Sequence, residues 1–181
     1  MTIPLNALPP FDEDGNLCVV VESPRGSSLK LEYVPRKRIF SISRALPIGV
    51  TYPYDWGFIP GTLAPDGDPL DAMVLHSAAT YPGVLLPCRI LGVVMMSQIQ
   101  KGKREENHRV IAVPTWNNRL EDVDDAARLP KRMRRELEQF FLTATFFTGK
   151  NVQIEGWGGP LRARAVVNRS IASEIGGSLR E

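Results

Sequence analysis

The sequence reads Asp66-Gly67-Asp68-Pro69-Leu70-Asp71 in its first half, and so places three carboxylates around a glycine and a proline that block regular structure. Two unit charges 4 Å apart repel by about 4 kcal/mol at the effective dielectric near a protein surface. Carboxylates that converge therefore need a cation, and ligands that are all oxygen favour Mg²⁺ over Zn²⁺. The stretch predicts a site for a hard metal ion.

The same residues also fit a solvated surface turn, because Asp-Gly and Asp-Pro are common turn dipeptides. A calcium-binding EF-hand loop is excluded sooner. Counted from Asp66, the twelfth position is Ser77, where that loop needs a bidentate glutamate. Taken alone, the stretch leaves a metal site and a plain turn as alternatives.

Length and composition describe one globular domain over residues 1–181, long enough to bury a core. Hydrophobic residues make up 43% of the chain and charged residues 23%, which excludes a disordered chain. The formal net charge of +2 is too small to indicate a nucleic-acid partner. Cys18 and Cys88 lie in apolar runs and are expected to be reduced core residues, although a disulfide between them stays open.

The first residues show no positive charge followed by an apolar stretch, so we expect no signal peptide. No apolar run reaches about 18 residues, so we expect no membrane span. The sequence therefore predicts a soluble, cytoplasmic protein without a membrane partner.

Short apolar and β-branched runs predict most of the strands. Residues 17–22, 29–34 and 38–43 follow one another with tight turns, which favours a meander that begins a closed barrel. Residues 45–65 are rich in proline, glycine and aromatic side chains and predict a packed, irregular segment. Residues 72–76 form a brief apolar run. Further along, strands are expected at residues 88–96, 110–113 and 152–155, with a loop or hairpin end at 98–109.

Helical spacing begins in the second half, after Pro130. Apolar residues recur at that spacing from Met133 to Phe147, and Gly149 supplies a stop. Pro160 starts a last helix that ends near Gly176, whereas residues 1–16 predict a loose N-terminal arm. The expected fold is a small barrel of short strands with two helices against it.

The run from Tyr52 to Pro60, followed by Asp66 to Asp71, resembles the signature of soluble family I inorganic pyrophosphatases. More blocks occur in the family's order over roughly residues 15–172: Val19–Glu22, Lys30, Glu32, Arg44, Cys88–Val93, Ile111–Pro114 and Glu155–Trp157. The resemblance implies an α+β, mainly β fold, an OB-like five-stranded barrel with two flanking helices. It also implies Mg²⁺-dependent hydrolysis of inorganic pyrophosphate to two phosphates, with Mn²⁺ as a possible substitute ion, and a homo-oligomer.

The resemblance gives the acidic positions a role in metal binding. Asp66, Asp68 and Asp71 match the aspartates that approach divalent metal from one wall of the family's cavity. The middle aspartate helps to deprotonate a water held between two metals, which makes Asp68 the candidate general base. Glu22 and Glu32 match outer acidic positions that bind further metal.

The basic positions are implied to hold the substrate. Lys30 and Arg44 match residues that grip the phosphates, and Trp56 stands at a usual tyrosine. Arg109 falls at a lysine that contacts phosphate, and Asn107 falls at a metal-binding aspartate, where an amide still offers an oxygen.

Two parts of the family's site are altered. Gln98 falls at a second metal-binding aspartate, and Thr143 and Ala144 replace a Tyr-Lys pair that holds substrate. Two Mg²⁺ ions would bring four positive charges, whereas the three aspartates offer three negative charges. One or two metal ions are therefore expected rather than three or four. Activity is expected to be reduced, unless Glu105 or Glu106 replaces a lost carboxylate.

Three hypotheses follow. A Mg²⁺-dependent inorganic pyrophosphatase comes first, and a divergent phosphohydrolase acting on another phosphorylated substrate comes second. The third is a non-catalytic homologue that binds metal and phosphate. An OB-like barrel can also bind single-stranded nucleic acid, and residues 101–104 are basic with Trp116 nearby. A short run of charged residues, however, is usually a solvated loop. We therefore expect no nucleic-acid partner.

Overall fold

The structure is a computed structural model that describes residues 3–116 and 120–178. Five strands close a barrel. Strand β1 pairs with β4, β4 with β5, β5 with β8 and β8 with β6, and β6 pairs back with β1. Only the β5–β8 pair among these is parallel. The barrel strands are β1 (Leu17–Ser23), β4 (Asp55–Phe58), β5 (Asp71–Val74), β6 (Leu85–Gln100) and β8 (Arg109–Pro114). The predicted five-stranded barrel is confirmed.

Strands β1 and β4 approach each other closely at Gly57. Every residue of β1 is buried, as its continuous apolar run requires. Gly57 of β4 permits the close approach, because a Cβ added there would lie 2.0 Å from the backbone oxygen of Val20. Sequence analysis expected an irregular segment over 45–65 and missed β4. Its strand form is imposed by pairing with β1 and β5 rather than by its own glycine-containing sequence.

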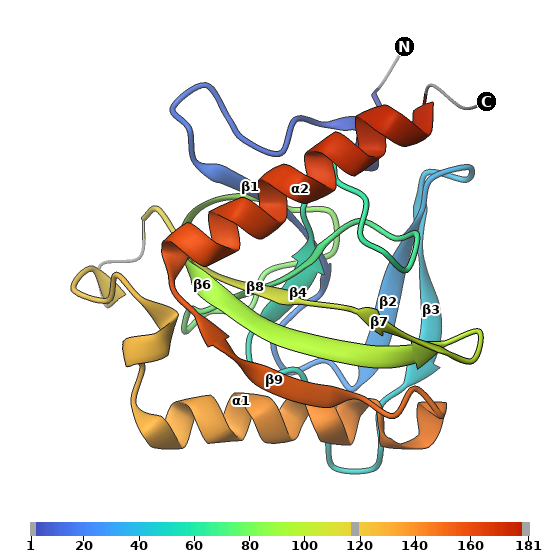
Figure 1. Ribbon diagram of the computed structural model, residues 1–181, viewed down its shortest axis with the longest axis vertical. Coiled ribbons are helices and arrows are strands. Elements are labelled where there is room, and N and C mark those ends of the chain that lie inside the picture. Colours follow the sequence, from blue (N-terminus) through green and yellow to red (C-terminus); the bar gives the residue numbers. More distant parts are fainter. Residues whose placement is uncertain (1–2, 117–119, 179–181) are drawn as a thin grey trace.

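The hairpin of β2 (Leu29–Val34) and β3 (Ile39–Ala45) forms a separate two-stranded sheet beside the barrel (Figure 1). The prediction that the first three strands form one meander is therefore wrong for the step from β1 to β2, because β1 pairs with β4 and β6 instead. Two further strands, β7 (Lys103–Glu106) and β9 (Gln153–Gly158), extend the sheet from β6. The expected hairpin end at 98–109 is the β6–β7 turn.

Two helices flank the barrel, as predicted (Figure 1). Helix α2 (Pro160–Ser178) crosses one end and packs against β6, whereas α1 (Lys131–Ala144) runs along β9. The prediction carried the first helix to Phe147, but α1 ends at Ala144. There the Thr145 hydroxyl donates to the Phe141 carbonyl, and a 3-10 turn, η4 (Phe146–Thr148), follows. Two more 3-10 turns, η1 (Leu5–Ala7) and η3 (Ala126–Arg128), lie elsewhere.

The barrel interior and the helix contacts form two buried clusters. One cluster joins β1 and β8 to α2 through residues such as Val19, Val110 and Val167. The other joins the aromatic residue Trp56 of β4 to Phe141 of α1. Helix α1 therefore holds its apolar face against the wall that carries the aspartate stretch. Cys18 and Cys88 are free and buried, as expected, and Cys88 belongs to the first of these clusters.

The N-terminal segment is packed rather than loose over residues 3–16, and Met1 and Thr2 lie outside the described residues. The Gly61 amide donates to the Asn6 carbonyl at 2.9 Å, and Phe11 pairs with Leu17. These contacts place η1 beside the segment that leads to the aspartates. Among the described helices, none is long and apolar enough to cross a membrane.

Candidate active site

The acidic stretch forms a fixed turn that enters β5. The Ala64 amide donates to the Asp68 carbonyl at 2.8 Å, and the Gly67 amide donates to the Ala64 carbonyl at 3.0 Å. Gly67 has a φ of +89°, which favours glycine. Asp71 is the first residue of β5. The stretch is thus both a turn and an ordered carrier of three carboxylates.

These carboxylates border two adjoining cavities, which share Lys30, Asp68 and Asp71. The basic cavity, of about 90 Å³, lies between the barrel and α1. The acidic cavity, of about 280 Å³, lies between β2, the aspartate turn and η1. Every site residue predicted from the sequence lines at least one of them: Glu22, Lys30, Glu32, Arg44, Trp56, Asp66, Asp68, Asp71, Asn107 and Arg109.

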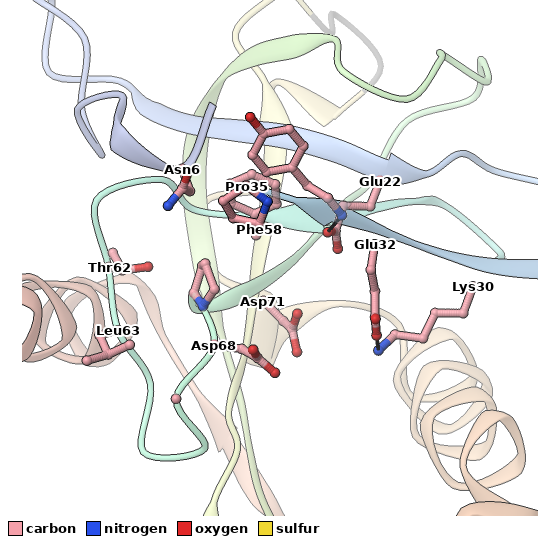
Figure 2. A pocket seen from close by; sticks show the side chains of 13 residues that line it. Asn6, Glu22, Lys30, Glu32, Pro35, Phe58, Thr62, Leu63, Asp68 and Asp71 are labelled. Atoms are coloured by element: carbon pink, nitrogen blue, oxygen red, sulfur yellow. Dashed lines mark hydrogen bonds and ion pairs between the residues drawn. The ribbon is translucent and has the colours of Figure 1, made fainter. Parts of the chain in front are cut away.

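The acidic cavity collects carboxylates from three elements. Figure 2 shows Asp68 and Asp71 directed into the space that Glu32 and Lys30 enter from β2. Lys30 Nζ lies 2.5 Å from Glu32 Oε1, so this lysine is paired in the free protein. Burial raises the pKa of Glu22 to about 8, against a hydrogen bond from the Tyr33 amide.

Burial disfavours the charged form of the three aspartates. Burial raises the pKa of Asp66, Asp68 and Asp71, and for Asp68 the charge of Asp71 adds to this effect. Arg109 opposes the rise in the pKa of Asp71. A bound cation would reverse such shifts, because it stabilises the charged form.

Arg109 joins the altered positions of the site into one cluster. Its Nη1 lies 2.7 Å from Asp71 Oδ2 and donates to Asn107 Oδ1 and, at 3.2 Å, to the His108 carbonyl. Its guanidinium carbon lies 5.2 Å from the centre of the Trp56 ring. Arg109 therefore contacts both Trp56 and Asn107, which also differ from the residues usual in the family.

Residues 19–174 match the sequence profile of the family described as Inorganic pyrophosphatase. This chain belongs to the inorganic pyrophosphatase family. It is 37% identical over 157 residues to an inorganic pyrophosphatase of Thermus thermophilus, covering 84% of this chain and 87% of the relative. It is 34% identical over 166 residues to one of Sulfolobus acidocaldarius, covering 88% and 91%.

Solved structures agree. The crystal structure of inorganic pyrophosphatase from Thermus thermophilus superimposes with a TM-score of 0.86 at 34% identity, over 96% of this chain and 99% of that one. A second, from Neisseria gonorrhoeae, gives a TM-score of 0.81 at 28% identity, over 93% and 96%. The predicted family, the hydrolase class and the mainly β fold are confirmed. Members of this family depend on metal in general.

The donor chemistry of this family member fits a hard cation, with one restriction. Three aspartate side chains line one wall of the basic cavity and offer the oxygens that such an ion prefers. Within residues 3–116 and 120–178, however, no group of three or more His, Cys, Asp or Glu residues stands close enough to hold a metal unaided. Water or other oxygen ligands would complete the shell, as is common for Mg²⁺.

Sequence analysis missed Lys150, which also lines the basic cavity. It follows η4 and Gly149, whose φ is +70°. Burial lowers the pKa of Lys150, and the neighbouring charges of Lys30 and Arg109 lower it further. The signal that could have found it is the missing lysine at Ala144, since a cation in the next loop could reach the same space.

The remaining sequence positions divide between the cavity and the surface. Gln98 and Ala144 line the basic cavity, whereas the Thr143 hydroxyl accepts from Gln139 on the exposed side of α1. Glu106 contacts Arg169 at 2.7 Å and lines a different hollow beside α2. Neither Glu105 nor Glu106 is among the residues that line the acidic or the basic cavity.

Proposed function

We propose that this chain hydrolyses inorganic pyrophosphate to two phosphates, using Mg²⁺ held by the aspartate wall. One observation carries the proposal: the aspartate trio shares one small cavity with four basic side chains, Lys30, Arg44, Arg109 and Lys150. Phosphoryl transfer asks a protein mainly for positioning and charge stabilisation. Anionic and cationic walls that face one cavity supply both.

Asp68 is the proposed general base. It is the middle aspartate of the stretch and borders both cavities, so its carboxylate could accept a proton from a water in either of them. A bound metal supplies an acidified water and draws charge from the phosphoryl oxygens. Asp66 and Asp71 would hold such an ion, with the outer carboxylates Glu22 and Glu32 beyond them.

The opposite wall is proposed to hold the phosphates. Lys30, Arg44, Arg109 and Lys150 bring positive charge from separate elements. Trp56 is 6% exposed, and its Nε1 is buried without a hydrogen-bond partner in the described structure. A buried donor without a partner is unfavourable, so a phosphate oxygen in this cavity would satisfy it. Asn107 retains an oxygen for metal, although that atom accepts from Arg109 here.

Three finer expectations stay predictions. Mg²⁺ is proposed as the physiological ion because all the wall ligands are oxygens, and Mn²⁺ is expected to replace it in part. A cytoplasmic location stays an expectation from the sequence, and a homo-oligomer is proposed from the resemblance alone.

The direct test is phosphate release from pyrophosphate with and without Mg²⁺. We expect release that requires the ion and that falls by about 10²- to 10⁴-fold in Asp68→Asn, the usual contribution of a general base. Asp14→Asn, in an exposed turn, is the matched control and should behave as the parent does. No release above background from the parent protein would reject the proposal.

A second candidate is hydrolysis of another phosphorylated compound. The acidic cavity adjoins the aspartates and has an apolar side formed by Tyr33, Pro35 and Phe58. Asn6 also lines it, with its side-chain oxygen buried and without a partner in the described residues. That side could accommodate an organic group attached to phosphate. A screen of nucleotides and small phosphoesters tests this candidate, which fails if pyrophosphate is strongly preferred over all of them.

A further inference from the structure

The ion pair between Arg109 and Asp71 occupies an oxygen that a metal ion could bind. Nη1 and Oδ2 are 2.7 Å apart, and the two side chains are 9% and 25% exposed, so the pair is partly shielded from water. A shielded pair is screened far less than a surface pair. A metal ion that used Asp71 Oδ2 would have to displace the guanidinium, and Asp71 would otherwise have only Oδ1 to offer.

The surroundings of Arg109 fit a planar guanidinium. Trp56 lies against it at 5.2 Å, and Asn107 and the His108 carbonyl both accept from Nη1. An ammonium group could also donate to these acceptors, but it has no plane that could stack on the indole ring of Trp56. The neutral side chains at 98 and 107 remove negative charge that would otherwise compete for Arg109. Arg109 is thus held by several contacts at Asp71.

A diphosphate ligand offers Arg109 another partner. Guanidinium binds phosphate oxygens in bidentate geometry about as well as it binds carboxylate. A metal that arrives alone displaces Arg109 from Asp71 without providing a new partner. A metal that arrives with a diphosphate provides one, since Arg109 and the anion line the same small cavity.

We propose that Arg109 is an internal cation that holds Asp71 in the empty site, so that the divalent ion binds tightly only together with a diphosphate. The inference rests on the proposed function, because it concerns the metal and substrate of that same site. Arg109 then competes with the metal ion for Asp71, in addition to contacting the substrate. By thermodynamic reciprocity, metal must strengthen diphosphate binding by the same factor.

The test is Mn²⁺ binding to the full-length protein by titration calorimetry, with and without saturating methylenediphosphonate, which is not hydrolysed. A titration of Mn²⁺ into the diphosphonate alone is subtracted. We expect the diphosphonate to tighten Mn²⁺ binding by about 5- to 150-fold, the usual range of coupling between two ligands. Equal Mn²⁺ affinity in both conditions would overturn the proposal.

Variants separate the guanidinium from general charge. Arg109→Gln is expected to bind Mn²⁺ alone at least about fivefold more tightly and to lose most of the coupling. Arg109→Lys keeps the charge without the planar fork, and should be intermediate. Arg44→Gln is the matched control: Arg44 lines the same cavity, but no ion pair given for the described residues joins it to a carboxylate. If Arg44→Gln gained as much affinity for Mn²⁺ as Arg109→Gln does, the effect would be one of net charge and the proposal would be refuted.

Phosphate release distinguishes this inference from the proposed function. A protein that hydrolyses pyrophosphate but shows no coupling refutes only the role of Arg109. A protein that releases no phosphate refutes the proposed hydrolysis, while its Mn²⁺ titrations still support or refute the role of Arg109. Circular dichroism of each variant shows that a change in binding is not a loss of fold.

Discussion

His76 Nε2 lies 2.9 Å from Asp55 Oδ2 inside the protein, where the two side chains are 1% and 0% exposed. Asp55 also accepts from the Thr80 hydroxyl at 2.6 Å and from the Arg25 amide at 2.8 Å. Asp55 precedes Trp56, so this network fixes the start of β4 next to the basic cavity. Two segments far from Asp55 in the chain, one at Arg25 and one at residues 76–80, are thereby tied to its carboxylate.

We expect Asp55→Asn to lower the free energy of unfolding by about 2 kcal/mol at pH 7, because the amide leaves one or more buried donors poorly paired. Urea unfolding measures the loss. Asp124→Asn, which changes an exposed pair with Arg128, should cost far less. A loss at Asp55 no larger than at Asp124 would mean that the network carries little stability.

The same carboxylate makes a specific pH dependence. Burial favours a higher pKa for Asp55, but the bonds from His76, Thr80 and the Arg25 amide outweigh it and hold the pKa below the usual range of an aspartate. A lowered folded pKa adds stability that is fully present above the unfolded pKa and lost as pH falls through the folded one. The difference between parent and Asp55→Asn should therefore shrink below pH of about 4. A constant difference from pH 7 to pH 3 would contradict this.

Lys150 is expected to replace the lysine that the family carries on the preceding helix. Lys150→Met should raise KM for pyrophosphate about tenfold, because one charge-assisted hydrogen bond to phosphate is worth about 1.4 kcal/mol. Steady-state kinetics at fixed Mg²⁺ measure it. Lys103→Met, on the exposed strand β7, is the control of equal charge change. Equal KM values in the two variants would show that Lys150 does not bind the substrate.

Local patterns predicted the strands that local forces determine. Residues 17–22 and 29–34 match β1 and β2 closely, because β-branched runs and alternation are properties of the segment itself. Strand β4 and the closure of β6 on β1 depend on partners far away in the chain, and no local signal contains them.

The candidate site divides in the same way. The resemblance supplied the aspartates and basic residues as a set of positions, and the structure brings them to two cavities. It could not supply Lys150, whose reach depends on where α1 ends and how η4 turns. Nor could it supply the contact between Arg109 and Trp56, which depends on side chains from two strands meeting.

Gln98 is where a lost carboxylate can be restored. Its side chain is 1% exposed, and its Nε2 lies 3.5 Å from Asp66 Oδ2. A glutamate there would be a buried anion beside a second anion, which is unfavourable unless a cation lies between them. We therefore expect Gln98→Glu to be less stable than the parent by about 2 kcal/mol without metal, and to regain much of that loss in Mg²⁺.

Thermal unfolding followed by fluorescence measures this, with and without saturating Mg²⁺. The rise in Tm on adding Mg²⁺ should be several degrees larger for Gln98→Glu than for the parent, since the stabilisation of the folded state by a ligand grows with the logarithm of its affinity. Gln153→Glu, at an exposed position on β9, controls for the added charge and should respond to Mg²⁺ as the parent does. An identical Mg²⁺ response in all three proteins would show that position 98 does not face the metal, and would leave the aspartate trio as its main source of carboxylates.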